Sequence, residues 1–276
     1  MPVLLPTATT YDRVLLEREL IEKRLRTPAA PVDQTWSRKM WHRYFFAEMF
    51  PNLYKNFPQW RFLFEVAMEM RLACPPGSTI LDIGAGECRY KQLLSHCSYT
   101  AFDFALTGAQ YDFSKLDFIG DACRIPLGDG SFDAAMSFAV MEHVPSMETA
   151  SAEMARVVRS GGTCHVIFPL ARPEHMVPYD FFRSTRYGIR SVFAKVGLDI
   201  VEIRASNGSL WTAVNYLWLA ALDGPARGRG KRNLARKIVK AAWATALMPL
   251  MLYAIATDRR YPDDFPIYYY VKAVKK

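Results

Sequence analysis

The stretch Ile80-Leu-Asp-Ile-Gly-Ala-Gly-Glu-Cys-Arg89 decides the fold of this chain. A short apolar run that ends in Gly84-Ala-Gly86 is typical of a buried strand that turns directly into a helix. In such a turn, backbone N–H groups approach an anion at the helix N-terminus. A dinucleotide site has a third glycine in the pattern G-x-G-x-x-G, and here that position is Arg89. The loop therefore predicts an anionic cofactor and disfavours NAD.

Composition indicates a folded protein with a sizeable core. Hydrophobic residues make up 51% of the 276 residues, enough for one large α/β domain with additions. The net charge of +8 is concentrated in one short segment. Such a segment suits a membrane surface, phosphate or nucleic acid, although a solvated loop is the commoner meaning. Its cations are Arg227, Arg229, Lys231, Arg232, Arg236, Lys237 and Lys240.

Cysteine usage and the N-terminal residues bear on location. The five cysteines are scattered, and none forms a C-x-x-C pair or a Cys/His cluster with zinc spacing. We therefore expect reduced thiols in a cytoplasmic protein with no bound metal. Charged residues from Asp12 to Arg18 precede any apolar run, so we expect no signal peptide.

The chain divides into four expected segments. Residues 1–74 have helical periodicity and many aromatic residues, which predicts an N-terminal helical extension or lid. From residue 75 to 204, short apolar runs alternate with helical stretches, as in βαβ units with a parallel sheet. Residues 205–262 form an apolar helical pair with the basic loop, and residues 263–276 form a final strand.

The patterns predict strands at 79–83, 99–102, 117–120, 132–138, 162–168 and 199–203, and helices at 90–95, 147–158 and 185–196. Gly161-Gly162 and Gly197 lie where a helix is expected to end and a strand to begin. Thr185 is expected to cap the N-terminus of a helix.

Two stretches near the C-terminus, 205–222 and 241–257, contain no charged residue. Both are shorter than the about 20 residues of a spanning helix, and Pro249 interrupts the second. Two interpretations stay open. The pair packs on the sheet, or it attaches to the inner face of a membrane through residues 205–257.

Further motifs follow the glycine turn at regular intervals. Asp103 ends the second strand, 21 residues after Asp82. In order, the motifs read LDIGAGECRY, AFD, GDACRIPLGDGSFD, FAVMEHV and RVVRSGG. Over about residues 75–205 this order resembles the class I S-adenosylmethionine-dependent methyltransferases, most closely the type 11 subgroup. The missing third glycine is less necessary for that cofactor, because it carries a carboxylate rather than a pyrophosphate.

The resemblance implies an α/β fold with a Rossmann-like, seven-stranded, mostly parallel sheet and helices on both faces. Ile267–Val274 would be its antiparallel final strand. It also implies S-adenosyl-L-methionine as cofactor and assigns contacts to it. Gly84 and Gly86 would contact the methionine moiety, Asp103 the ribose, Asp121 with Ala122 the adenine, and Ala139 to His143 the methyl-donor pocket. Arg89 is a candidate for the cofactor's carboxylate, with Asp82 bracing the turn.

Candidate catalytic residues follow the fourth and fifth strands, at the edge where ligands of open α/β sheets bind. His143 has the pKa of a general base near neutral pH, but it and Glu142 could equally shape the loop. His175, Tyr179 and Asp180 lie in a loop with unusual polar content. The alternative for this loop is an Asp180–Arg183 ion pair that fixes its shape.

The sequence thus predicts an enzyme that transfers a methyl group to a hydroxyl of a small-molecule or glycan acceptor, with lipid-linked sugars and polysaccharide biosynthesis as the context. A quinone, polyketide or lipid acceptor is the alternative. A cofactor-binding protein without turnover and an NAD(P)-dependent oxidoreductase are the rival classes. Nucleic acid is not expected as a partner, because residues 227–240 lack interleaved aromatics.

Overall fold

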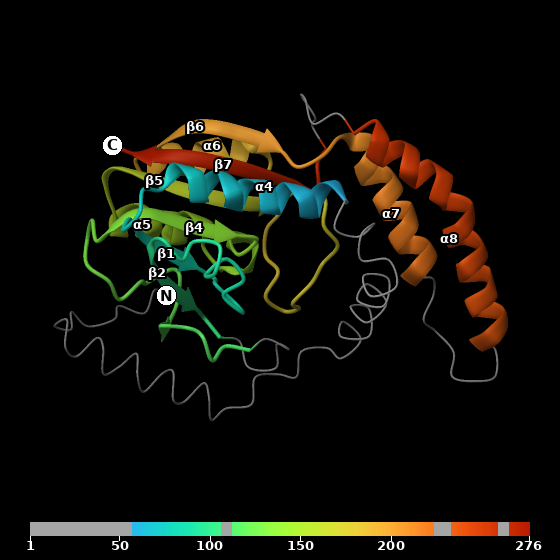
Figure 1. The fold of residues 1–276 in the computed structure, drawn as a ribbon, viewed down its shortest axis with the longest axis horizontal. Helices are drawn as coiled ribbons and strands as arrows, with labels where there is room; N and C mark the ends of the chain where they lie inside the picture. Colours follow the sequence, from blue (N-terminus) through green and yellow to red (C-terminus); the bar gives the residue numbers. More distant parts are fainter. Residues whose placement is uncertain (1–56, 106–111, 224–232, 259–264) are drawn as a thin grey trace, which may run out of the picture.

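The computed structural model describes residues 57–105, 112–223, 233–258 and 265–276. Its core is a seven-stranded sheet with the order β3-β2-β1-β4-β5-β7-β6, in which β7 runs antiparallel to the six other strands (Figure 1). This confirms the predicted sheet and its antiparallel last strand. The strands are β1 (Thr79–Ile83), β2 (Ser98–Asp103), β3 (Phe118–Ile119), β4 (Phe132–Phe138), β5 (Val158–Pro169), β6 (Leu198–Ala205) and β7 (Tyr268–Lys275).

Helices cover both faces of the sheet, as expected. Successive side chains of a strand point to opposite faces, so β5 divides its contacts between two layers. Val166 and Phe168 pack in one core cluster with α5 (Met147–Val157) and α6 (Arg186–Lys195), whereas Ile167 packs in another with α4 (Pro58–Ala73). The side chains of Ser146 and Thr185 cap α5 and α6, which confirms the predicted cap at Thr185.

Two local predictions are wrong. Residues 90–95 form turns rather than a helix, so no helix follows the glycine turn directly. Cys88, just before this segment, has φ of 54°, which is not a right-handed helical conformation. Gly161 and Gly162 lie inside β5, beside a bulge against β4, and not at a junction between helix and strand. Gly197, with φ of 75°, does connect α6 to β6.

The apolar helical pair is α7 (Ser209–Asp223) and α8 (Asn233–Ala256), and Pro249 lies inside α8. Residues 233–240 of the predicted basic loop belong to α8, so this part of the stretch is helical. The pair lies on the side toward which β4 and β6 point (Figure 1). Among the described residues, none of the helices has the length and hydrophobicity needed to cross a membrane.

The predicted N-terminal extension lies largely outside the described residues, and only α4 represents it. Helix α4 begins at Pro58, and proline is a favoured residue in the first turn of a helix. The segment boundaries at 74, 204 and 262 stay predictions.

Candidate cofactor and acceptor site

The carboxyl ends of β1, β2, β4 and β5 lie at one edge of the sheet, because these strands are mutually parallel. The loops after them hold four non-glycine residues in the left-handed region, with φ between 50° and 57°. Such conformations are costly for L-residues and gather at functional sites. The four are Cys88, Ala105, Ala139 and Met176. This edge is therefore the candidate site.

The two glycines of the first loop carry different constraints. Gly84 has φ of 81°, and an added Cβ would lie 2.2 Å from Cγ2 of Val140, in the loop after β4. Gly86 has φ of 53°, and an added Cβ would meet no atom of the described residues within 4 Å. Gly84 therefore lets two loops of the edge pack together, whereas the backbone at Gly86 is open to the approach of a ligand.

Asp103 connects the first two loops. Its Oδ2 accepts a hydrogen bond of 2.8 Å from the Gly86 amide, and its Oδ1 accepts one of 2.8 Å from the Ala105 amide. Each carboxylate oxygen keeps a second lone pair for another donor. The carboxylate is therefore held beside the open turn in a position that suits the ribose hydroxyls of the cofactor, and this role stays a prediction.

Asp82 and Arg89 flank the turn in contrasting environments. The Asp82 side chain is buried and accepts a hydrogen bond from the Tyr99 hydroxyl. Burial raises the pKa of Asp82 to about 7, although the bond from Tyr99 opposes this shift. The Arg89 side chain is 61% exposed and its Nη2 lies 3.3 Å from Oε2 of Glu87. The bracing role of Asp82 and the contact of Arg89 with the cofactor's carboxylate both stay predictions.

The residues expected at the adenine and at the methyl-donor pocket also lie in loops of this edge. Oδ1 of Asp121 accepts a hydrogen bond of 2.8 Å from the Cys123 amide, and Ala122 is buried. Such a bond is typical of an Asx turn, so the structure gives Asp121 a local role as well. Ala139, whose amide donates to the Ile167 carbonyl over 2.9 Å, packs against the apolar cluster to which α4, β5, β7, α7 and α8 contribute.

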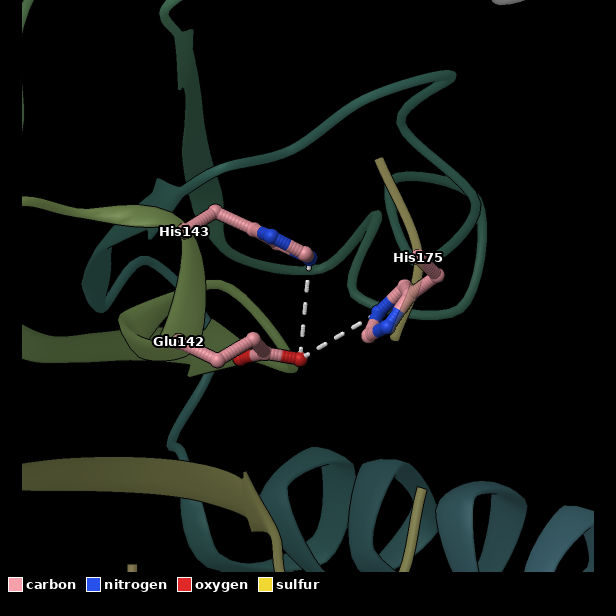
Figure 2. Close-up of side chains that lie close together, drawn as sticks. All are labelled: Glu142, His143 and His175. Atoms are coloured by element: carbon pink, nitrogen blue, oxygen red, sulfur yellow. Dashed lines mark ion pairs between the residues drawn. The ribbon is translucent and has the colours of Figure 1, made fainter. Parts of the chain in front are cut away.

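The structure brings His143 and His175 together with Glu142, which the sequence singled out only as a residue that shapes the loop (Figure 2). Glu142 and His143 lie in the short helix η1 (Met141–His143), and His175 lies in the loop after β5. Both Nε2 atoms lie 3.7 Å from Oε1 of Glu142, and the two imidazole centroids are 4.7 Å apart. The adjacent residues Glu142 and His143 do not by themselves indicate that His175, more than thirty residues later in the sequence, lies beside them.

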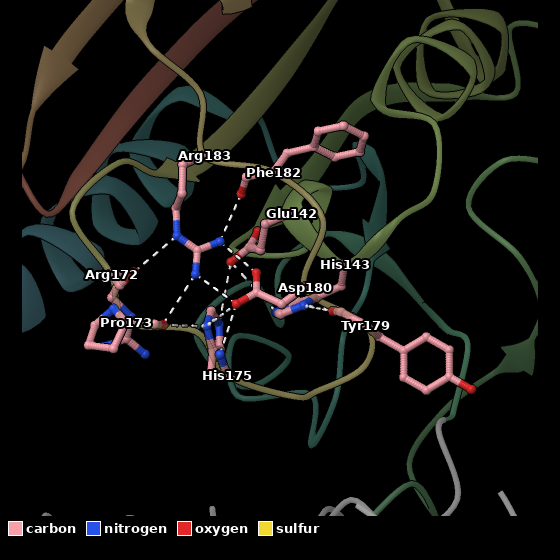
Figure 3. A network of polar contacts seen from close by, with 9 residues as sticks. All are labelled: Glu142, His143, Arg172, Pro173, His175, Tyr179, Asp180, Phe182 and Arg183. Atoms are coloured by element: carbon pink, nitrogen blue, oxygen red, sulfur yellow. Dashed lines mark hydrogen bonds and ion pairs between the residues drawn. The ribbon is translucent and has the colours of Figure 1, made fainter. Parts of the chain in front are cut away.

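A network of polar contacts fixes the loop after β5 around these residues (Figure 3). Asp180 accepts hydrogen bonds from Nη1 and Nη2 of Arg183, at 2.5 and 2.7 Å, and from the His175 amide at 2.8 Å. The Nε of Arg183 donates to the Arg172 carbonyl over 3.0 Å. The ion pair considered as the alternative is therefore present, and it holds Asp180 in a structural position.

Tyr179 contributes its backbone rather than its side chain to this network. Its carbonyl oxygen is bonded to Nδ1 of His143, while its ring points away from the cluster (Figure 3). The catalytic roles predicted for Tyr179, Asp180, His143 and His175 stay predictions.

Burial sets the ionisation of the cluster. It raises the pKa of Glu142 to about 8 and lowers the pKa of His175 to about 3. Burial also lowers the pKa of His143, although the bond to the Tyr179 carbonyl opposes this shift. Burial acts to raise the pKa of Asp180, but hydrogen bonds from Arg183 and the His175 amide outweigh it and leave that pKa below its usual value. At pH 7 the His175 imidazole is therefore neutral, and the buried Glu142 carboxyl group is favoured in its protonated form.

Comparison with known proteins identifies the family to which the chain is similar. A family model described as a methyltransferase domain matches residues 81–166. A demethylmenaquinone methyltransferase of Mycobacterium sp. (strain KMS) is 39% identical over 183 residues, which cover 63% of this chain and 70% of that protein. A 2-methyl-6-phytyl-1,4-hydroquinone methyltransferase of Synechocystis sp. is 28% identical over 124 residues, or 40% of this chain and 38% of that protein.

Among solved structures, the MccD protein shares the fold with a TM-score of 0.50 and 12% identity, over 77% of this chain and 96% of that one. The open turn at Gly86 and the adjoining carboxylate of Asp103 fit the cofactor that such enzymes use. The chain belongs to the class I S-adenosylmethionine-dependent methyltransferases and is an enzyme that uses S-adenosyl-L-methionine as its cofactor.

Proposed function

We propose that this enzyme methylates the ring of a lipid acceptor with a prenyl-type tail, such as an isoprenoid quinol. One observation carries the proposal: the apolar cluster that α7 and α8 share with α4, β5 and β7 reaches the edge of the sheet where the candidate cofactor site lies. Trp211, Val214 and Met251 belong to this cluster, and Phe138 and Ala139, at the end of β4, pack against it. A hydrophobic tail held along the helical pair would thus leave its ring near the donor.

The outer surface of the pair also presents large apolar side chains. Trp243, Leu250 and Tyr253 are exposed on α8 at spacings that place them on one helical face. Leu210 and Leu217 are exposed on α7. Exposed apolar groups that gather in this way mark a surface for a membrane, a lipid or another protein. We propose that this face contacts the membrane in which the acceptor is dissolved.

The activities for which the relatives are named support the same acceptor class. The relatives are methyltransferases of demethylmenaquinone, of a phytyl hydroquinone and, for a Botryococcus braunii protein 28% identical over 114 residues, of squalene. Methylation of a glycan hydroxyl, which the sequence predicted, has no comparable support from the relatives and is the competing outcome in the test.

The protein's part in the reaction is mainly geometric. The sulfonium donor carries the driving force for an in-line displacement, so the site has to align the acceptor and exclude water. The loop after β5 is suited to this task, because its hydrogen bonds to η1 include the Phe181 amide to the Glu142 carbonyl at 2.8 Å.

An acceptor comparison tests the proposal. The rates of transfer of a labelled methyl group from S-adenosylmethionine are measured for a prenylated hydroquinone, for the same ring without its tail, and for an oligosaccharide with free hydroxyls. We expect kcat/KM for the tailed quinol to exceed that for the bare ring at least tenfold, because each buried methylene contributes about 0.8 kcal/mol. Faster methylation of the oligosaccharide than of either quinol would overturn the proposal.

Variants on the helical pair sharpen this comparison. Leu217→Ser should raise KM for the tailed quinol and leave the bare ring unaffected. Leu72→Ser is the matched control, because Leu72 is exposed on α4, outside the helical pair. Equal effects of the two substitutions would contradict a tail-binding role for the pair.

A further inference from the structure

Three atoms that can bind a cation converge between η1 and the loop after β5. They are Oε1 of Glu142, Nε2 of His143 and Nε2 of His175 (Figure 2). The ligand atoms offered by the three side chains all lie within 4.8 Å of one another. Binding of a metal ion by these atoms would be a function beyond the proposed methyl transfer.

The hydrogen bonds of the two imidazoles assign their tautomers. Nδ1 of His143 is bonded to the carbonyl oxygen of Tyr179, which can only accept. Nδ1 of His175 lies 3.1 Å from the Pro173 carbonyl oxygen and 3.3 Å from Oδ2 of Asp180, which are also acceptors. Each Nδ1 therefore carries the proton of its neutral ring, and each Nε2 presents a lone pair.

Both Nε2 atoms lie 3.7 Å from Oε1 of a buried carboxyl group. Glu142 is 2% exposed, and neither of its side-chain oxygens has a hydrogen-bond partner among the described residues. The nearby guanidinium of Arg183 is committed to Asp180 and to the carbonyls of Arg172 and Phe182. Burial favours the neutral form of Glu142 even though the positive charges of Arg172 and Arg183 oppose it, and a cation bound at Oε1 would take the place of that proton.

We propose that Glu142, His143 and His175 bind a divalent transition-metal ion through Oε1 and the two Nε2 atoms. Two histidines and one carboxylate form a ligand set that holds Zn²⁺ or Fe²⁺ and leaves positions open for water or substrate.

The observed distances suit such an ion. In a tetrahedral site with bonds of about 2.0–2.1 Å, ligand atoms stand about 3.3 Å apart. The two Nε2–Oε1 distances of 3.7 Å need to shorten by only a few tenths of an ångström. Histidine ligands of metals usually donate their other ring N–H to a carbonyl or carboxylate, which orients the ring. Both imidazoles already make that contact, His143 to a carbonyl and His175 to a carbonyl and Asp180.

Metal binding is measured on the full chain after treatment with a chelator, first with Zn²⁺ and then with Co²⁺ as a spectroscopic probe. We expect one ion per chain, with Co²⁺ giving visible d–d absorption and no thiolate charge-transfer band. The latter condition excludes the cysteines, which are free thiols where the structure describes them.

Three variants complete the test. Glu142→Gln and His175→Ala should weaken metal affinity at least tenfold, whereas His96→Asn should not, because His96 bonds to the Cys74 carbonyl away from the cluster. Circular dichroism checks that each variant is folded. Glu142→Gln keeps the shape of the side chain and serves if His175→Ala does not fold. Failure of the wild-type chain to retain an ion, unchanged affinity in Glu142→Gln, or a thiolate band with Co²⁺ would overturn the proposal. None of these results depends on which acceptor is methylated.

Discussion

At the scale of single residues, Gly84 and Gly86 show how one motif combines packing with ligand binding. The sequence placed both in a cofactor turn, and both adopt positive φ. Only the structure distinguishes them, because the neighbour that crowds Gly84 is Val140, in a loop distant in sequence. A local pattern identifies a turn but not what packs against it.

Gly84→Ala should destabilise the fold more than Gly86→Ala. Left-handed φ costs an alanine about 1–2 kcal/mol at either position. At Gly84 the contact with Val140 adds overpacking of about 1–3 kcal/mol. Denaturant unfolding measures the difference, and Gly84→Ala combined with Val140→Ala should recover the packing part. Equal losses in the two single variants would show that Val140 does not crowd the turn.

Asp103→Ala should weaken cofactor affinity at least tenfold. The substitution removes the acceptor of the Gly86 and Ala105 amides and of the predicted bonds to ribose, and losing a buried partner costs about 1–3 kcal/mol. Calorimetric titration with S-adenosylhomocysteine measures the effect. Asp199→Ala is the matched control, because Asp199 is an exposed residue of β6 that forms an ion pair with Lys276. Unchanged affinity in Asp103→Ala would exclude this carboxylate from the cofactor site.

Asp82 makes stability depend on pH. Its folded pKa of about 7 lies above the usual 3.8, so the folded chain binds more protons between these values, and stability falls as pH rises through that window. Asp82→Asn should therefore gain stability relative to the wild type as pH rises, by up to about 4 kcal/mol at pH 8. Urea unfolding at pH 5 and pH 8 measures this. A gain that is the same at both values would contradict the shifted pKa.

At the scale of elements, the strands were more predictable than the segments between them. β1 and β4 begin and end where the apolar runs do, because buried parallel strands need continuous apolar residues. Residues 90–95 have a helical apolar pattern but form turns, since Cys88 leaves the preceding backbone in a left-handed conformation. The Glu142–His175 contact could not be foreseen, because it depends on the path of a loop with no periodicity.

The helical pair supports a prediction about membrane attachment. Flotation with vesicles containing anionic lipid should recover the wild-type chain, because each basic residue near such a surface contributes about 1 kcal/mol. Replacing the seven cations between Arg227 and Lys240 by glutamine should abolish recovery. A chain that stays unbound with or without these charges would contradict attachment.

At the scale of the whole molecule, the fold concentrates its functional features at one end. Parallel strands place the glycine turn, Asp103, Ala139 and the loop after β5 at a single edge, and the apolar helices continue from that edge. The type of cofactor followed from the order of short motifs along the sequence. The acceptor did not, because it depends on how the C-terminal helices pack against β4 and β7.

Transfer of a labelled methyl group from S-adenosylmethionine to a membrane lipid extract is the most direct measurement of the proposed activity. We expect label in the organic phase, with one S-adenosylhomocysteine formed for each methyl transferred, and loss of both in Asp103→Ala. Label that appears only in a water-soluble glycan fraction, or no turnover with either fraction, would contradict a lipid methyltransferase.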